Sequence, residues 1–296
     1  MSEHASESRQ SSRPGLAKTS RSAAEPAAGA VASLLALQRS VGNRATARLL
    51  QREVQLRPPG RGEATAYDRR QEVVDRLNRQ SPGLVYWLSE PNERRAILRY
   101  EVWDEAAQNN FDREMRGFID RGEVVPMRLI TRQGLVGGGA LLIDSLQEAY
   151  VDLDDMMGSD DLSFEMNLIH FLTERFRIRN YERRIGTNMD AEFDRAHAAG
   201  IQAETEHLRA VIGDPTIRFN HEREENGRAI FVFRSREPFR YEIVHVFGRS
   251  RQGLSTGTVF ALRGTRRLTI PELIAERAGA AAPAAAAPAV PVPAVP

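Results

Sequence analysis

Apolar residues in the first half of the chain recur at intervals of three and four, between short stretches that contain Ser, Pro and Gly. That interval places side chains on one face of a helix, and proline or glycine ends the pattern. Ser81-Pro82-Gly83 is one such stop, and Gly122 is another. The pattern predicts amphipathic helices over residues 66–79, 92–107 and 110–120.

From Val124 onward the apolar runs become shorter and are separated by glycines and polar residues, a pattern typical of strands. It predicts short strands over residues 127–131, 140–144 and 149–153. The Gly137-Gly138-Gly139 triplet lies between the first two of these. Because the triplet lacks the Lys-Ser/Thr ending of a phosphate loop and the spacing of a dinucleotide fingerprint, it does not indicate a nucleotide site.

Two longer helices are predicted next, over residues 160–176 and 190–212, and Gly213-Asp214-Pro215 ends the second. The remainder changes period again and predicts an antiparallel meander, followed by a closing helix over residues 270–278. The predicted strands of the meander cover residues 216–221, 229–235, 239–247 and 256–263. A helical N-terminal half, short strands, two long helices and a C-terminal antiparallel meander together predict an α+β fold, not an alternating parallel one.

Composition divides the chain into four regions. Residues 1–30 are rich in Ser, Ala, Arg, Glu and Pro, which predicts a disordered leader. Residues 278–296 contain only Ala, Pro, Val and one Gly, which predicts a disordered tail that samples polyproline II. Between these flanks we predict a helical docking segment over residues 31–55 and a folded α+β body over residues 63–277.

Charge and cysteine content exclude several classes of function. The chain has 41 basic and 40 acidic residues, a net charge of +1, so we expect no nucleic-acid partner. There is no cysteine, which excludes disulfide scaffolds, thiol nucleophiles and thiolate metal sites. We expect no membrane span, because no apolar run approaches the roughly 20 residues that one needs. The leader also lacks the apolar core of a signal peptide, which predicts a soluble protein made in the cytoplasm.

An apolar and basic segment separates the leader from the body. Leu34, Leu37, Val41 and Ala45 are spaced to lie on one helical face, and Gly42-Asn43 interrupts the pattern. Asn is a favourable residue at the start of a helix. The segment therefore predicts two short helical pieces joined at a turn.

The run over residues 37–45, followed by Arg48-Leu49-Leu50-Gln51-Arg52, resembles the short N-terminal motif of proteins encoded with bacterial extracellular contractile injection systems. This resemblance implies docking to particle proteins of the tube or baseplate, and export inside the particle. The docking residues that it implies are Leu37, Gln38, Gly42, Asn43, Leu49 and Leu50. The chain is then an effector (toxin) acting on an unknown target protein, or an accessory protein. The alternative is a non-catalytic interaction or structural component of the particle.

The candidate chemistry lies on the two long predicted helices, which carry three of the six histidines, His170, His197 and His207. His170 and Glu174 are four residues apart, and His197 and Glu204 are seven apart, so each pair shares one helical face. Two facing helices can therefore direct imidazoles and carboxylates to one point. These four residues are the predicted metal ligands, and their nitrogen and oxygen donors suit zinc or another borderline divalent ion.

Residues 167–174, after a predicted strand and the Gly158-Ser159 turn, resemble the active-site helix of zinc metallopeptidases, whose signature is His-Glu-x-x-His. Two positions depart from it, because Phe171 replaces the catalytic glutamate and Glu174 replaces the second histidine. Phenylalanine cannot take a proton from water, so the resemblance implies a degenerate metal-dependent hydrolase in which another carboxylate acts. The candidate catalytic residues are Glu174, Glu165 and Glu206.

Two other interpretations of these helices stay open. One is an enzyme that uses histidine and carboxylate acid–base chemistry without a metal. In the other the helices are purely structural: His170 is a core histidine with a backbone partner, and Glu174 pairs with a nearby arginine.

Overall fold

The computed structural model of the chain describes residues 53–57, 69–89, 95–121, 123–130, 144–225, 228–236, 239–247 and 257–281. The chain divides into two units, Met1–Leu50 and Gln51–Pro296, and every described residue belongs to the second. The predicted leader, the tail beyond residue 281 and the predicted docking residues from Leu37 to Leu50 lie outside the described residues.

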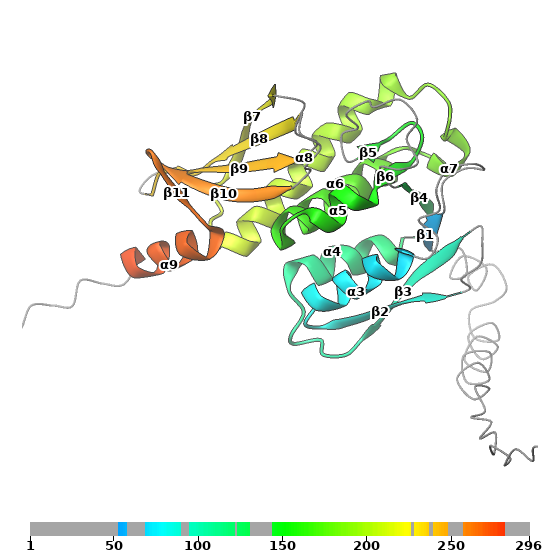
Figure 1. The fold of residues 1–296 in the computed structure, drawn as a ribbon, viewed down its shortest axis with the longest axis horizontal. Coiled ribbons are helices and arrows are strands. Elements are labelled where there is room, and N and C mark those ends of the chain that lie inside the picture. Colours follow the sequence, from blue (N-terminus) through cyan, green and yellow to red (C-terminus); the bar gives the residue numbers. More distant parts are fainter. Residues whose placement is uncertain are drawn as a thin grey trace, which may run out of the picture. The chain divides into compact units, whose positions relative to one another are not determined.

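A six-stranded mixed sheet has the strand order β2-β3-β1-β4-β6-β5 (Figure 1). Its strands are β1 (Glu53–Arg57), β2 (Leu84–Ser89), β3 (Ala96–Val102), β4 (Val124–Ile130), β5 (Asp144–Ser145) and β6 (Tyr150–Asp152). β4 runs parallel to β1 and to β6, and the other neighbours are antiparallel. Helix α3 (Arg70–Gln80) contacts β2, and α4 (Asn110–Ile119) contacts β1 and β3.

A five-stranded antiparallel sheet has the order β11-β10-β9-β8-β7. Its strands are β7 (Arg218–Glu225), β8 (Arg228–Arg234), β9 (Glu242–Phe247), β10 (Thr258–Arg263) and β11 (Arg266–Leu268). Successive side chains of a strand point to opposite faces of its sheet. Phe231 and Phe233 therefore join the main core, whereas Ile230 and Val232 belong to a smaller cluster on the other face.

Two long helices, α6 (Asp161–Arg177) and α8 (Asp190–Ile212), pack side by side and contact strands of both sheets: α6 contacts β4 and β10, and α8 contacts β7. In the sequence, α5 (Leu153–Gly158) precedes α6 and α7 (Tyr181–Arg184) follows it, and α9 (Ile270–Ala281) comes after β11. α8 ends where Gly213 adopts a left-handed conformation with φ 70°, as at many helix C-termini. No helix of the described residues combines the length and the hydropathy of a membrane span.

The predicted α+β class is confirmed, as is the antiparallel C-terminal sheet. The bounds of α4, α6, α8 and β8 differ from the predicted bounds by one residue at most. These elements have the clearest local signals, because helix caps and glycine or proline stops mark their ends.

The predicted helix over residues 92–107 is wrong, since Ala96–Val102 forms strand β3, which pairs with β2. Leu98 and Val102 have a helical spacing of four, but together with Tyr100 they also satisfy a period of two, and aromatic and β-branched side chains favour a strand. Pairing with β2 makes this segment a strand and not a helix, and the sequence pattern did not predict β2.

The start of the body also differs from the prediction. Glu53–Arg57 forms strand β1, between β3 and β4, so residues 53–55 are not the end of a helical segment. The folded body therefore begins before residue 63, and the N-terminal half is a mixed sheet with helices, not a helical layer. Short apolar segments such as Val54-Gln55-Leu56 become strands only through their pairing.

Asp160 connects the start of α6 to β10. Its Oδ1 accepts a hydrogen bond from the Ser163 backbone N–H at 2.7 Å, and its Oδ2 accepts one from the Val259 N–H at 2.7 Å. Its own N–H donates to the Gly257 carbonyl at 2.8 Å. One carboxylate therefore caps a helix and also satisfies a donor of the five-stranded sheet.

We expect Asp160→Ala to lower the free energy of unfolding by about 2–4 kcal/mol, because it removes a helix cap and leaves a partly buried N–H without an acceptor. Urea denaturation measures this change. Asp194→Ala, at an exposed position of α8, is the matched control and should change stability by less than about 0.5 kcal/mol. Equal losses in the two variants would contradict the double role of Asp160.

Candidate metal centre

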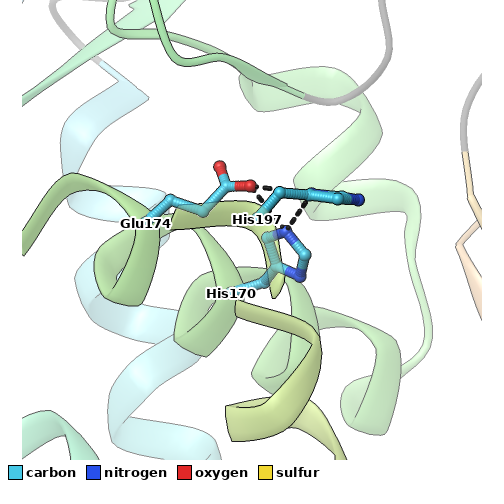
Figure 2. A group of neighbouring side chains, drawn as sticks. All are labelled: His170, Glu174 and His197. Atoms are coloured by element: carbon cyan, nitrogen blue, oxygen red, sulfur yellow. Dashed lines mark hydrogen bonds and ion pairs between the residues drawn. The ribbon is translucent and has the colours of Figure 1, made fainter. Parts of the chain in front are cut away.

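The candidate centre lies where α6 faces α8. His170 and Glu174 are one turn apart on α6, and His197 comes from α8 (Figure 2). Gly200 of α8 packs directly against the imidazole of His170, since a Cβ at this position would lie 2.8 Å from the ring. The absence of a side chain at residue 200 therefore lets the His170 ring lie against the neighbouring helix.

Three atoms converge to form what we call the donor triangle: His170 Nε2, Glu174 Oε1 and His197 Nδ1. The Glu174 oxygen is 2.9 Å from each nitrogen, and the two nitrogens are 3.2 Å apart. Figure 2 shows the carboxylate and both rings turned toward one another. The structure thus brings together three of the four predicted metal ligands, from two helices, as a group that can hold a metal ion.

Each imidazole of the donor triangle has a second carboxylate at its other nitrogen. Glu204 Oε1 lies 3.0 Å from His170 Nδ1, and Glu222 Oε2 of β7 lies 3.1 Å from His197 Nε2. A carboxylate accepts a hydrogen bond, so the nitrogen that faces it must carry a proton. With an ion in place of the protons that face Glu174, the triangle nitrogens would be the lone-pair nitrogens, in the arrangement usual for histidines that bind metals.

Aromatic side chains hold the two imidazoles. The Phe231 ring centroid lies 5.9 Å from each of them, and the Phe193 ring stacks on His197 at 5.2 Å and 13°. The side chains of His170 and Glu174 are 7% and 4% exposed, whereas that of His197 is 23% exposed. The centre is therefore buried on the α6 side and reaches the surface at His197.

Burial and charge act in opposite directions on the pKa values of these groups. Burial lowers the pKa of His170, but Glu174 and Glu204 outweigh it and hold that pKa well above 6.5. Burial raises the pKa of Glu174, yet the two imidazoles bring it down to about 2. The hydrogen bond to Glu174 raises the pKa of His197. Without an ion, protons on the imidazoles therefore balance the buried carboxylates.

The remaining predicted site residues lie elsewhere. Glu204, predicted as a ligand, faces His170 Nδ1 and not the donor triangle. Glu165 Oε2 lies 2.8 Å from His207 Nε2, in a separate pair between α6 and α8. Glu206 is exposed and accepts a hydrogen bond from Gln202 on its own helix. Neither Glu165 nor Glu206 contacts the donor triangle.

Sequence reasoning did not assign Glu222 or His245 to the site. Glu222 is one of several charged residues in the segment Arg218–Glu225, and nothing in that pattern distinguishes it from Glu224 or Glu225. His245 lies within the apolar run of β9, which predicts a structural histidine. Only the pairing of β7, β8 and β9 brings these two residues toward α6 and α8.

The spacing of the donor triangle can be compared with that of real ligands. An ion with bonds of about 2.1 Å separates neighbouring ligand atoms by about 3.0 Å at right angles and by about 3.4 Å at the tetrahedral angle. The three edges of the donor triangle, 2.9, 2.9 and 3.2 Å, lie close to the first value. They are shorter than the tetrahedral value by about 0.2 to 0.5 Å. The triangle therefore has the dimensions of one face of a coordination polyhedron.

Comparison with known proteins gave no match to this chain among protein-family models, curated proteins or solved structures. What the site can do follows from its own residues and distances.

We expect Gly200→Ala to lower the free energy of unfolding by about 1–3 kcal/mol, because the new methyl group displaces a ring that two carboxylates hold. This outweighs the gain of about 1 kcal/mol in helix propensity. Gly117→Ala on α4 is the control, since a Cβ there meets nothing within 4 Å. It should raise stability by up to about 1 kcal/mol. Denaturation of both variants is the measurement, and a stabilised Gly200→Ala would contradict the packing.

Proposed function

We propose that this chain is a metalloprotein that binds one divalent transition ion, with zinc the first choice, and that its activity is metal-dependent hydrolysis. The observation that carries this proposal is the donor triangle with a second carboxylate behind each imidazole. A buried structural histidine needs one partner for each of its two ring nitrogens and does not require a second imidazole on the same carboxylate oxygen. Two imidazoles that share one carboxylate oxygen and are each oriented by another carboxylate form the usual surroundings of a metal.

The ligand types support zinc. Two imidazoles and one carboxylate make the same ligand set as in a large group of catalytic zinc enzymes, and nitrogen ligands disfavour calcium and magnesium. Structural zinc sites use four protein ligands, whereas catalytic ones use three and leave a position for water and substrate. When bound, such an ion supplies a Lewis acid that polarises a carbonyl oxygen and activates water.

The charge balance also supports an ion at this place. Three carboxylates, of Glu174, Glu204 and Glu222, contact the two imidazoles. With both rings protonated, the rings contribute two positive charges. A divalent ion bound to the neutral rings contributes the same charge, so it replaces protons without unbalancing a buried site.

In the zinc-peptidase signature the glutamate after the first histidine accepts the proton of water, but here Phe171 follows His170. In this proposal another carboxylate accepts that proton. Of the three carboxylates that contact the imidazoles, Glu204 and Glu174 are almost fully buried, and the Glu222 side chain is 42% exposed. Glu222 is therefore the one that water can reach most readily, but its contact with His197 Nε2 lies on the far side of that ring from the donor triangle. Glu165 is engaged with His207 and is not required for this role.

We expect the native protein, dialysed against zinc and then against buffer, to retain one zinc per chain in elemental analysis. His170→Ala and His197→Ala should lose it, because each removes a ligand. His207→Ala removes a buried histidine of the same helix pair that does not contact the donor triangle, and it should retain zinc. The assay for hydrolysis measures the new amino termini that appear when the protein is mixed with denatured polypeptides. The zinc-loaded protein should release them, and the zinc-free protein should not. A native protein without zinc would refute the proposal.

We also propose that the chain is an effector addressed to a contractile injection particle by the segment before the body. The resemblance over residues 37–52 supports this, and the division of the chain after Leu50 assigns all but the last two of these residues to a different unit from the metal centre. A deletion must stop at residue 50, because Glu53–Arg57 is strand β1 of the six-stranded sheet.

Deletion of residues 1–50 should abolish loading into purified particles while zinc content and thermal unfolding stay those of the full chain. Co-purification with particles, measured by immunoblot, tests this. A full-length chain with Leu37→Asp and Leu49→Asp provides a control of unchanged length and should also fail to load, because a carboxylate disrupts an apolar docking face. Undiminished loading of the truncated chain would refute the addressing role.

A further inference from the structure

We infer that His245 is a positioning residue for the donor triangle, acting through Glu204, with Ser163 orienting His245 in turn. This inference rests on the proposed function, because it concerns how His170 is presented to an ion. Nothing in the zinc-peptidase resemblance includes these residues, which come from the start of α6, the middle of α8 and the third strand of the meander.

A continuous row of polar groups leads away from the donor triangle on the far side of His170. Glu204 Oε1 contacts His170 Nδ1 at 3.0 Å, and Glu204 Oε2 lies 3.8 Å from His245 Nδ1, an ion-pair distance. His245 Nε2 is 2.9 Å from Ser163 Oγ. One carboxylate is thus shared between two imidazoles, and the second imidazole ends on a hydroxyl group.

One assignment of protons places a donor opposite an acceptor at every contact of this row when His170 Nε2 is a ligand. His170 Nδ1 must then carry the proton, which it donates to Glu204 Oε1. His245 Nδ1 must likewise carry a proton to face Glu204 Oε2, so its Nε2 accepts from the Ser163 hydroxyl. Asn167 donates to the same hydroxyl oxygen at 3.2 Å, which leaves the Ser163 proton free to point at His245.

Burial makes the contact between Glu204 and His245 important. The side chains of both residues are 0% exposed, so neither can exchange its partner for water. Among the described residues neither Glu204 Oε2 nor His245 Nδ1 has a hydrogen-bond partner, and the 3.8 Å contact between them is longer than a hydrogen bond. An unpaired atom of this kind is costly, and for a carboxylate the penalty is larger than for a neutral group. Glu204 thus has His170 as its main partner at Oε1, and His245 Nδ1 is the polar group that faces its second oxygen.

The surroundings hold this row in place. Ser163 lies in the first turn of α6, where Asp160 caps its N–H. Gly257 approaches from the start of β10 so closely that a Cβ there would collide with Ser163 Oγ and Ser159 Cβ. Phe231 contacts the ring of His245 as well as those of His170 and His197. The five-stranded sheet thus fixes His245, and His245 fixes the carboxylate that selects the tautomer of His170.

The test compares zinc and cobalt affinities of purified variants by competition with a chelator at constant pH. His245→Leu removes both ring nitrogens and should weaken zinc binding about tenfold, the lower end of the range for groups that orient metal ligands. His245→Asn keeps a donor near the position of Nδ1 and should restore most of the affinity. The cobalt absorption spectrum should shift in His245→Leu and return toward that of the native protein in His245→Asn.

His207→Leu is the matched control. His207 is also buried and lies on α8, but its two ring nitrogens contact Asn110 of α4 and Glu165 of α6, not Glu204 or His170. This variant should lose stability while its zinc affinity stays within about twofold of the native value. If His245→Leu does not fold, Ser163→Ala replaces it, with a smaller loss of affinity expected because only the orientation of His245 is relaxed.

The same titration separates the possible failures. A native protein that binds no zinc refutes the proposed function. If the native protein binds zinc and both His245→Leu and Ser163→Ala bind it with the native affinity, the positioning role alone is overturned. Equal losses of affinity in His245→Leu and His207→Leu also overturn it, because the effect would then follow general destabilisation.

Discussion

The buried imidazole of His170, held between two carboxylates, is the interaction on which the rest of this site depends. An ionised carboxylate in an apolar interior requires a positive partner, and Glu174 and Glu204 both find it in the same ring. That arrangement requires α6 and α8 to approach closely, which the missing side chain of Gly200 permits. It also requires a cap that fixes where α6 begins, which Asp160 provides while it contacts β10.

The site combines residues from distant parts of the sequence, and the two elements that face each other contribute differently. The helix pair supplies the donor triangle, whereas the antiparallel sheet supplies Glu222, His245 and the aromatic ring of Phe231. Because His170 and Glu174 are one helical turn apart, the backbone of α6 fixes the direction in which both side chains point. The sheet limits rotation of the rings, through the Glu222 carboxylate at His197 and the Phe231 ring against both imidazoles. An imidazole constrained in both ways has little freedom to lose when it binds an ion, which favours affinity.

Local signals in the sequence predicted the long helices and the main part of the site, but not its surroundings. His170, Glu174 and His197 were found because a separation of four on one helix, and capped bounds for both helices, are properties of short segments. Glu204 was placed on the correct helix face but assigned as a ligand, since sequence spacing does not say which ring nitrogen a carboxylate meets. Glu222 and His245 depend on strand register across β7, β8 and β9, and the β2–β3 hairpin depends on a partner. Nonlocal pairing of this kind leaves no period in the sequence.

The place of β1 in the six-stranded sheet has a mechanical consequence. β1 is an interior strand, paired with β3 on one side and β4 on the other, and it begins three residues after the end of the first unit, at Leu50. Tension applied to the N-terminal end of the chain is therefore transmitted directly to the middle of the sheet, where two ladders of backbone hydrogen bonds resist it together. Traction at Glu53 would therefore load an interior strand, and loss of that strand would break the pairing with β3 and β4 together.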